Sequence, residues 1–189
     1  AAAAGGVAVP GVRLLASVGP DALVLGRDAR PGTALSDLDA AQVSDATLAD
    51  AWRQLRRLHD ARIAHRGLVG EAVRVVADGR VVLTGLQEAT VAASDLLLRL
   101  DVAHLLAATA VVVGAARAVA AARAAVAEDP VAVAGLLQPV ALPRETRRRL
   151  DDGLLAALQR RLLPDSGEVA PPDGVAALER LRPRTVVTV

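Results

Sequence analysis

The chain begins with short apolar runs and continues with stretches in which apolar residues recur every three or four positions. Residues 12–18 and 22–28 are Val- and Leu-rich runs separated by the turn sequence Gly-Pro-Asp, so we expect an antiparallel pair of strands. Residues 1–12, interrupted by glycines and a proline, are expected to be a frayed segment that forms no helix.

A helix is predicted from about Asp45 to His59. Ser44 is a favourable N-cap residue, and Arg side chains in the last turns complement the negative end of the helix dipole. The face that this helix buries is predicted by an apolar series at helical spacing, which consists of Leu48, Trp52, Leu55 and Leu58.

Two further β-type runs, residues 72–76 and 81–85, flank a turn whose Asp-Gly pair predicts a hairpin. The later periodic segments are helical in pattern, and the predicted helices span residues 95–113, 115–127, 131–137 and 144–163. Strands that come early and helices that come late predict an α+β fold. After Pro164 a Pro- and Gly-rich stretch predicts a linker that leads into a basic segment.

Composition narrows the chemistry available to these 189 residues. Ala, Leu and Val supply most of the 53% apolar share, while Phe, Tyr, Met, Cys, Lys and Asn are absent. The preference for Arg over Lys is typical of a GC-rich genome, such as that of an actinobacterium. The lack of cysteine excludes disulfides, thiolate chemistry and Cys-based zinc sites.

Charge and hydropathy indicate where the chain could meet a membrane. The formal charge is +1, but arginines gather late in the chain, at residues 144–149, at 160–161 and at 180–184. Such patches can face phosphates or anionic lipid. The start lacks the pattern of a signal peptide. The longest apolar run, residues 105–116, is shorter than the roughly 20 residues that a membrane span needs, so we expect no span within the chain.

One motif carries most of the functional information: LHDARIAHRGLVGEAVRVVADGRVVLTGLQEA, residues 58–89. In layout it resembles the catalytic loop and the following hairpin of protein-kinase-like folds. His65 and Arg66 match the first two letters of the His-Arg-Asp motif of that family, with Gly67 in place of the catalytic Asp. Ala72 occupies the position of the metal-binding Asn, and Gly85 that of the Asp in Asp-Phe-Gly.

The resemblance also extends beyond the motif on both sides. Asp101, in RLDVAHLLA, matches the acidic residue that braces the backbone of the His-Arg turn in the family. Residues 22–35 resemble the strand and hinge that join the two kinase lobes. The resemblance therefore implies a truncated strand lobe with its hinge at residues 1–35, a helical lobe at 36–163, and a linker with a basic juxtamembrane segment at 164–189.

Two later stretches, LLQPVALPRETRRRL and LERLRPRTVVTV, resemble the kinase-like cytoplasmic segment of a family of actinobacterial membrane proteins. This is the lysylphosphatidylglycerol synthase transmembrane (flippase-like) family. The resemblance implies a location at the cell membrane on its cytoplasmic side, with the membrane-spanning part of the same polypeptide as partner. A basic segment with Arg180, Arg182 and Arg184 would then lie beside the bilayer, next to anionic lipid.

The residues at the three motif positions, Gly67, Ala72 and Gly85, predict a catalytically inactive domain with a regulatory or scaffolding role. Phosphoryl transfer needs a carboxylate base and oxygen ligands for Mg²⁺, and neither Gly nor Ala supplies a side-chain oxygen. We expect neither a cofactor nor a resident metal. The protein partner is not identified by the sequence, and GLVG at residues 67–70 lacks the basic and aromatic neighbours of a nucleic-acid clamp.

Two other hypotheses stay open. In the first, the domain is an atypical small-molecule or lipid kinase that uses Glu71, Glu88 or Asp95 as substitute metal ligands. In the second, it is a free soluble interaction domain. The three histidines, His59, His65 and His104, lack the spacing of a helical metal pair and are expected to be structural.

Overall fold

The computed structural model describes residues 2–17, 23–29, 31–125 and 129–163. The fold is α+β, as predicted, and helices predominate. The helices are α1 (Asp45–Asp60), α2 (Asp95–Ala125), α3 (Pro130–Leu136), α4 (Arg144–Arg149) and α5 (Asp152–Leu162). The strands are β1 (Val12–Ser17), β2 (Leu23–Arg27), β3 (Thr33–Ala34), β4 (Ile63–Ala64), β5 (Val73–Val75), β6 (Val81–Leu83) and β7 (Thr90–Val91).

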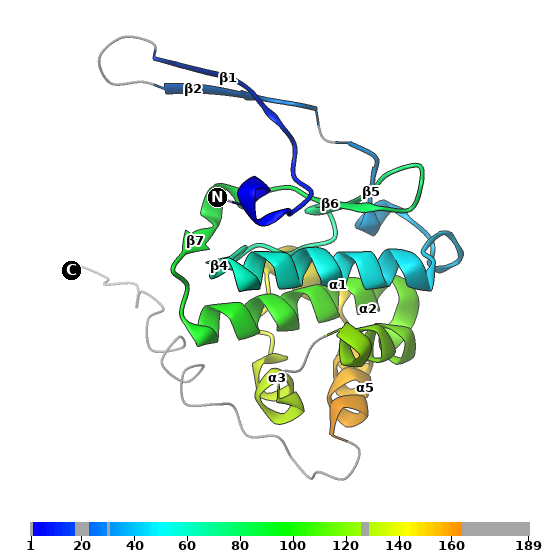
Figure 1. Ribbon diagram of the computed structural model, residues 1–189. Helices are drawn as coiled ribbons and strands as arrows, with labels where there is room; N and C mark the ends of the chain where they lie inside the picture. Colours follow the sequence, from blue (N-terminus) through cyan, green and yellow to red (C-terminus); the bar gives the residue numbers. More distant parts are fainter. Residues whose placement is uncertain (1, 18–22, 30, 126–128, 164–189) are drawn as a thin grey trace, which may run out of the picture.

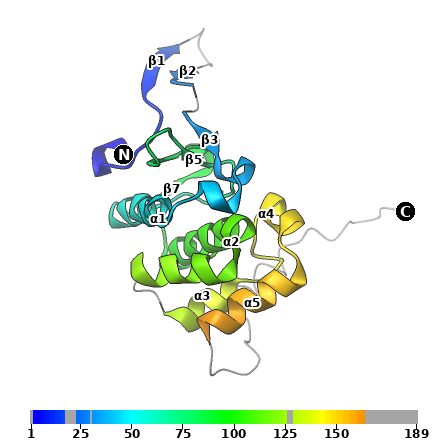
Figure 2. The ribbon, with the colours of Figure 1, turned by 90° about the vertical axis from the view of Figure 1, so that its right-hand side faces the viewer.

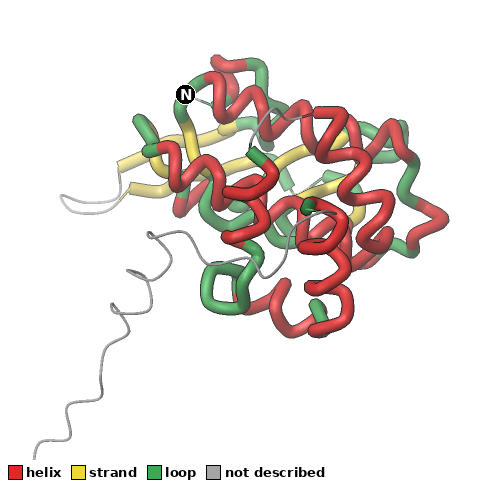
Figure 3. The backbone as a smooth tube through the Cα atoms, turned by 90° about the horizontal axis from the view of Figure 1, so that it is seen from below, coloured by secondary structure: helices red, strands yellow, loops and turns green. Residues whose placement is uncertain are grey.

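The elements stack in layers (Figure 1). The antiparallel sheet β3-β5-β6 lies over α1, α1 packs on α2, and α3 and α5 pack on the opposite side of α2. A view turned by 90° shows the same order and places α4 beside α2 (Figure 2). Seen from below, the helices form the near side and the strands lie behind them (Figure 3). The core is therefore built between α1 and α2.

Both predicted strand pairs are confirmed. β1 pairs antiparallel with β2 in a hairpin that projects from the body, and β5 pairs antiparallel with β6 (Figure 1). Gly79, in the turn between β5 and β6, has a φ of 82°, which glycine adopts at little cost. The two-residue strands β3, β4 and β7 were not predicted, because two residues are too few to show the alternation of apolar and polar positions that marks a strand.

α1 begins at the predicted cap and extends one residue past the predicted end. The Ser44 side chain accepts a hydrogen bond from the Thr47 N–H at 3.1 Å. The predicted apolar face is buried, and the indole of Trp52 is fully enclosed. Asp50 lies on the same helix and accepts the Val81 N–H, which ties α1 to β6.

The expectation of a frayed start is wrong for the described N-terminal residues. Ala3–Gly5 forms a short 3-10 turn, and Val7 is buried. The Ala8 N–H donates to Oε1 of Gln54, and the Ala8 carbonyl accepts the Leu83 N–H at 2.9 Å. The segment is ordered because its backbone groups find partners on α1 and β6, which local sequence cannot reveal.

α2 is broken at Gly114, where the sequence analysis separates two helices. Gly114 has φ 80° and ψ 160°, so the helix consists of two arms, residues 95–113 and 115–125. Asp95 pairs with Arg62 just beyond the end of α1, whereas Arg117 pairs with Asp45 at its beginning. The first arm therefore runs antiparallel to α1, and the second arm turns back and runs parallel to it.

The single helix predicted over residues 144–163 is wrong, because the structure has two. Leu150 is extended, with φ −95° and ψ 103°, and separates α4 from α5. Asp151 caps α5 by accepting the Leu154 N–H at 2.7 Å. Leu150, Leu154, Leu158 and Leu162 recur at helical spacing across the break, but the Asp151 carboxylate caps a new helix there.

By length and composition alone, α2 is the one helix of the described residues that could cross a membrane, contrary to the expectation of no span. In its most apolar stretch, 61% of the helix is buried inside the protein. The core helices of water-soluble folds are buried in the same way. The break at Gly114 also leaves no straight rod of the full length.

Candidate functional site

The loop between β4 and β5 is built on a carboxylate from α2. Asp101 is completely buried, and its two oxygens accept the backbone N–H groups of His65 and Arg66 at 2.5 and 2.8 Å. The bracing contact that the kinase-like resemblance implies for Asp101 is present in this geometry. One side chain of the core helix thus fixes the conformation of the His-Arg turn.

This turn needs such support because its backbone is unfavourable. Arg66 has a φ of 68°, in the left-handed region that non-glycine residues rarely occupy. A residue held there costs on the order of 1–3 kcal/mol, which the surrounding contacts must offset. Two charge-assisted hydrogen bonds to one buried carboxylate are strong enough to do so.

The His65 ring connects the turn to the strand that leads to Gly85. Its Nδ1 accepts the Gly67 N–H at 3.3 Å, so Nε2 carries the proton and donates to the Thr84 carbonyl at 2.8 Å. Burial lowers the pKa of His65, and the nearby Asp101 carboxylate opposes this without reversing it. His65 is therefore a neutral, structural crosslink in the site.

The three positions that the kinase-like resemblance matches to catalytic residues, Gly67, Ala72 and Gly85, lie around this ring. A Cβ placed on Gly85 would lie 3.8 Å from both the Ala72 Cβ and the His65 Cε1. Thr84 joins the same group, since its N–H and hydroxyl both donate to the Ala72 carbonyl. Gly67 faces open space. None of the three replaced positions presents a side-chain oxygen.

The proposed substitute ligands are not gathered here. Glu71 and Glu88 are both exposed, and Asp95 is engaged by Arg62 in an ion pair of 2.7 Å. Burial raises the pKa of Glu145 on α4, and the charge of nearby Glu71 raises it further, so Glu71 lies toward α4. Within the described residues, no group of three or more metal-ligating side chains forms.

Two of the histidines meet at the carboxylate of Asp101, which was not predicted: the His65 backbone N–H donates to it, and the ring of His59 lies beside it. His59 Nε2 lies 3.7 Å from Oδ2 of Asp101. His104 follows Asp101 on the same helix and bonds the Ala141 carbonyl through Nε2 at 2.8 Å. Burial lowers the pKa of His104 as well. No sequence signal joins these residues, because His59 and Asp101 lie on different helices.

The basic residues Arg180, Arg182 and Arg184 lie outside the described residues, as does the whole linker at 164–189. Neither a comparison with protein-family models nor a comparison with curated protein sequences finds a match for this chain. Any function must therefore be inferred from the residues themselves.

Proposed function

We propose that this chain is a degenerate kinase-like domain without phosphotransferase activity, and that it serves a membrane protein as a regulatory or scaffolding module. The observation that carries the proposal is the buried Asp101 carboxylate, which holds the backbone of the His65–Arg66 turn. In kinase-like folds an acid on the long core helix has this task, and the turn that it holds precedes the catalytic base.

The inactivity follows from the side chains at the reacting positions. Gly67 supplies no base, and losing a general base lowers a rate by about 10²–10⁴-fold. Ala72 and Gly85 supply no oxygen for Mg²⁺, so the electrostatic stabilisation of the transferred phosphoryl group is lost as well. A scaffolding role requires the folded loop that Asp101 holds, but it requires neither the catalytic base nor the metal ligands.

Attachment to an integral membrane protein of the flippase-like family is the finer part of the proposal. It is supported by the resemblance of residues 136–150 and 178–189 to such proteins and by the arginines that these segments contain. Arginines beside an anionic bilayer each contribute about 1 kcal/mol to binding. The apolar composition of α2 does not support membrane attachment, since much of this helix is buried inside the protein.

One experiment tests both parts. Membranes from cells that express the native gene at full length are washed with alkaline carbonate and then supplied with Mg²⁺ and ATP labelled on the γ-phosphate. The protein is expected to stay with the membranes and to transfer no label above that of cells lacking the gene. Release by carbonate would contradict the membrane attachment.

Substitutions distinguish weak phosphate transfer by this protein from transfer by a contaminating kinase. If label is transferred, the assay is repeated with Glu71→Ala, Glu88→Ala and the control Asp152→Ala, whose carboxylate is exposed at the start of α5. Transfer that is lost in either Glu variant and kept in the control would overturn the proposal of inactivity. It would establish the atypical kinase instead.

A further inference from the structure

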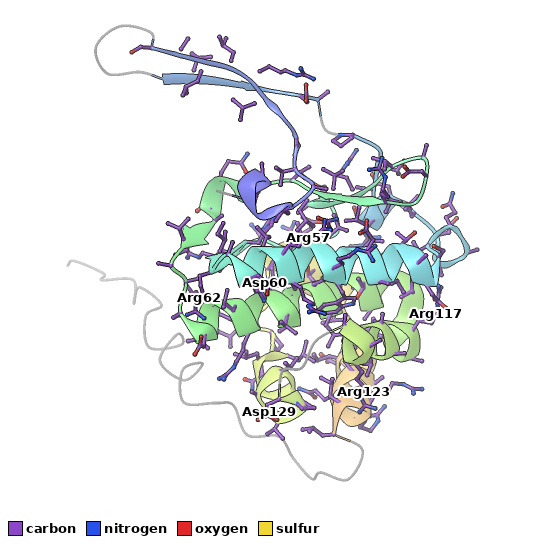
Figure 4. The ribbon with its side chains drawn as sticks, in the orientation of Figure 1. Arg57, Asp60, Arg62, Arg117, Arg123 and Asp129 are labelled. Atoms are coloured by element: carbon purple, nitrogen blue, oxygen red, sulfur yellow. The ribbon has the colours of Figure 1, made fainter. Side chains whose placement is uncertain are left out.

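A long groove lies between α1 and the second arm of α2. Its volume is about 680 Å³, and residues from Asp45 to Asp60 line one side of it. Arg57 and Asp60 lie toward one end of α1, and Arg117 lies near the other end (Figure 4). Sixteen residues of helix extend about 24 Å, so the groove is an elongated trough.

The trough exists because the two helices that flank it run parallel and present small side chains. Gly114 turns the second arm of α2 back along α1, and Arg56 Nη1 reaches the Ala125 carbonyl at its far end. The floor is alanine, contributed by Ala49, Ala120, Ala121, Ala124 and Ala125. Alanine leaves room for the backbone of a further element to approach closely.

The walls of the trough carry more positive than negative charge. Four arginines line it, against the carboxylates of Asp45 and Asp60; the arginines are Arg53, Arg56, Arg57 and Arg117. Arg117 is paired with Asp45, and Arg53 is paired with Asp50.

Arg56 and Arg57 differ from the other two arginines. Each donates to a backbone carbonyl, of Ala125 and of Gly6 respectively, and neither pairs with a carboxylate of the described residues. Within the described part of the chain, no ion pair therefore neutralises the charges of Arg56 and Arg57.

We propose that this trough is the docking site for an acidic amphipathic helix of a partner protein. Two parallel helices with a floor of small residues accept a third helix lengthwise, which is a recurring mode of peptide recognition. The alanine floor would take the apolar stripe of that helix, and Arg56 and Arg57 would pair with carboxylates beside the stripe. This site does not depend on the kinase-like assignment.

Fluorescence anisotropy of a labelled peptide tests the docking site with the full chain. The probe is a designed helix of about 16 residues, the length of α1, with alanines along one stripe and glutamates on both sides of it. A second probe carries lysine at every glutamate position. The acidic probe is expected to bind saturably and to weaken as salt rises, and the basic probe is expected not to bind.

Variants locate the binding. The double variant Arg56→Glu/Arg57→Glu and the trough-filling Ala124→Trp are each expected to weaken binding about tenfold or more. Arg56→Lys, which keeps the charge, should retain most of the binding. Arg148→Glu on α4 changes the charge of an exposed arginine that does not line the trough, and it should leave binding unchanged. Circular dichroism spectra and melting curves identify any variant that fails to fold.

Three outcomes would overturn the proposal. The first is the absence of saturable binding of the acidic probe to the wild-type chain. The second is an equal loss of binding in Arg148→Glu, which would indicate diffuse charge attraction. The third is binding to vesicles of phosphatidylglycerol that Ala124→Trp and the double variant abolish while peptide binding is unaffected, which would assign the trough to lipid.

Discussion

At the scale of single residues, the Asp101 side chain holds a loop that is distant from it in the chain. It lies on α2, is fully buried, and accepts two backbone hydrogen bonds from a loop that begins 36 positions earlier in the chain. A carboxylate can be buried at acceptable cost only when hydrogen bonds satisfy it. Here those bonds also hold Arg66 in a left-handed conformation.

Asp101→Ala is expected to lower the free energy of unfolding by about 2–4 kcal/mol, because the N–H groups of His65 and Arg66 would lose their partner inside the protein. Urea denaturation followed by circular dichroism measures this. The matched control is Asp95→Ala, on the same helix but exposed, whose ion pair with Arg62 should contribute almost nothing. Equal effects of the two variants would contradict a bracing role.

The buried histidines predict a pH dependence. Burial lowers the pKa values of His65 and His104 in the folded state, so the unfolded chain, whose histidines titrate near pH 6.5, binds more protons. Stability is therefore fully present above about pH 6.5 and is lost as the pH falls below it. Urea unfolding at about pH 7.5 and about pH 5.5 is expected to show this loss.

His104→Gln separates one of the two contributions. Glutamine can keep a donor for the Ala141 carbonyl but does not titrate. The variant should lose less stability between the two pH values than the wild-type chain does. A wild-type stability that stays constant over this interval would show that the buried histidines bind protons as readily as those of the unfolded chain.

At the scale of elements, Gly114 determines the shape of α2. With φ 80° and ψ 160°, it occupies a region that is open almost only to glycine. The reversal that it permits places the second arm beside α1 and creates the trough. The break between α4 and α5 has a different cause, since the Asp151 side chain caps a new helix there.

Gly114→Ala is expected to destabilise the chain by about 1–3 kcal/mol, as measured by urea denaturation. The cost comes from the backbone alone, because a Cβ at this position would meet nothing within 4 Å. Gly67→Ala is the control: its Cβ also faces open space, but its φ is not left-handed, so stability should not fall. A Gly114→Ala chain as stable as the wild type would mean that α2 continues straight through this position.

At the scale of the whole molecule, the parts join through contacts between distant segments. β3, in the region predicted as a strand-lobe remnant, pairs with β5 in the region predicted as the helical lobe. Residues 2–9 reach across to α1 and β6. The same apolar α2 that could cross a membrane by composition serves as the central layer of the protein.

The sequence by itself determined the features that depend on neighbouring residues. The Ser44 cap and the spacing from Leu48 to Leu58 fix α1, the Asp-Gly pair fixes the β5–β6 hairpin, and Gly114 marks the break in α2. Each of these signals lies within a few residues of its effect, because caps, turns and helical periods are local properties of the chain.

Tertiary structure decided what depends on segments that meet only after folding. His59 and His65 meet at Asp101, residues 2–9 find partners on α1 and β6, and an alanine trough opens between α1 and the second arm of α2. None of these has a local pattern, because the stabilising partner lies many positions away. A buried carboxylate or a backbone N–H is satisfied by whichever group the assembled fold brings to it.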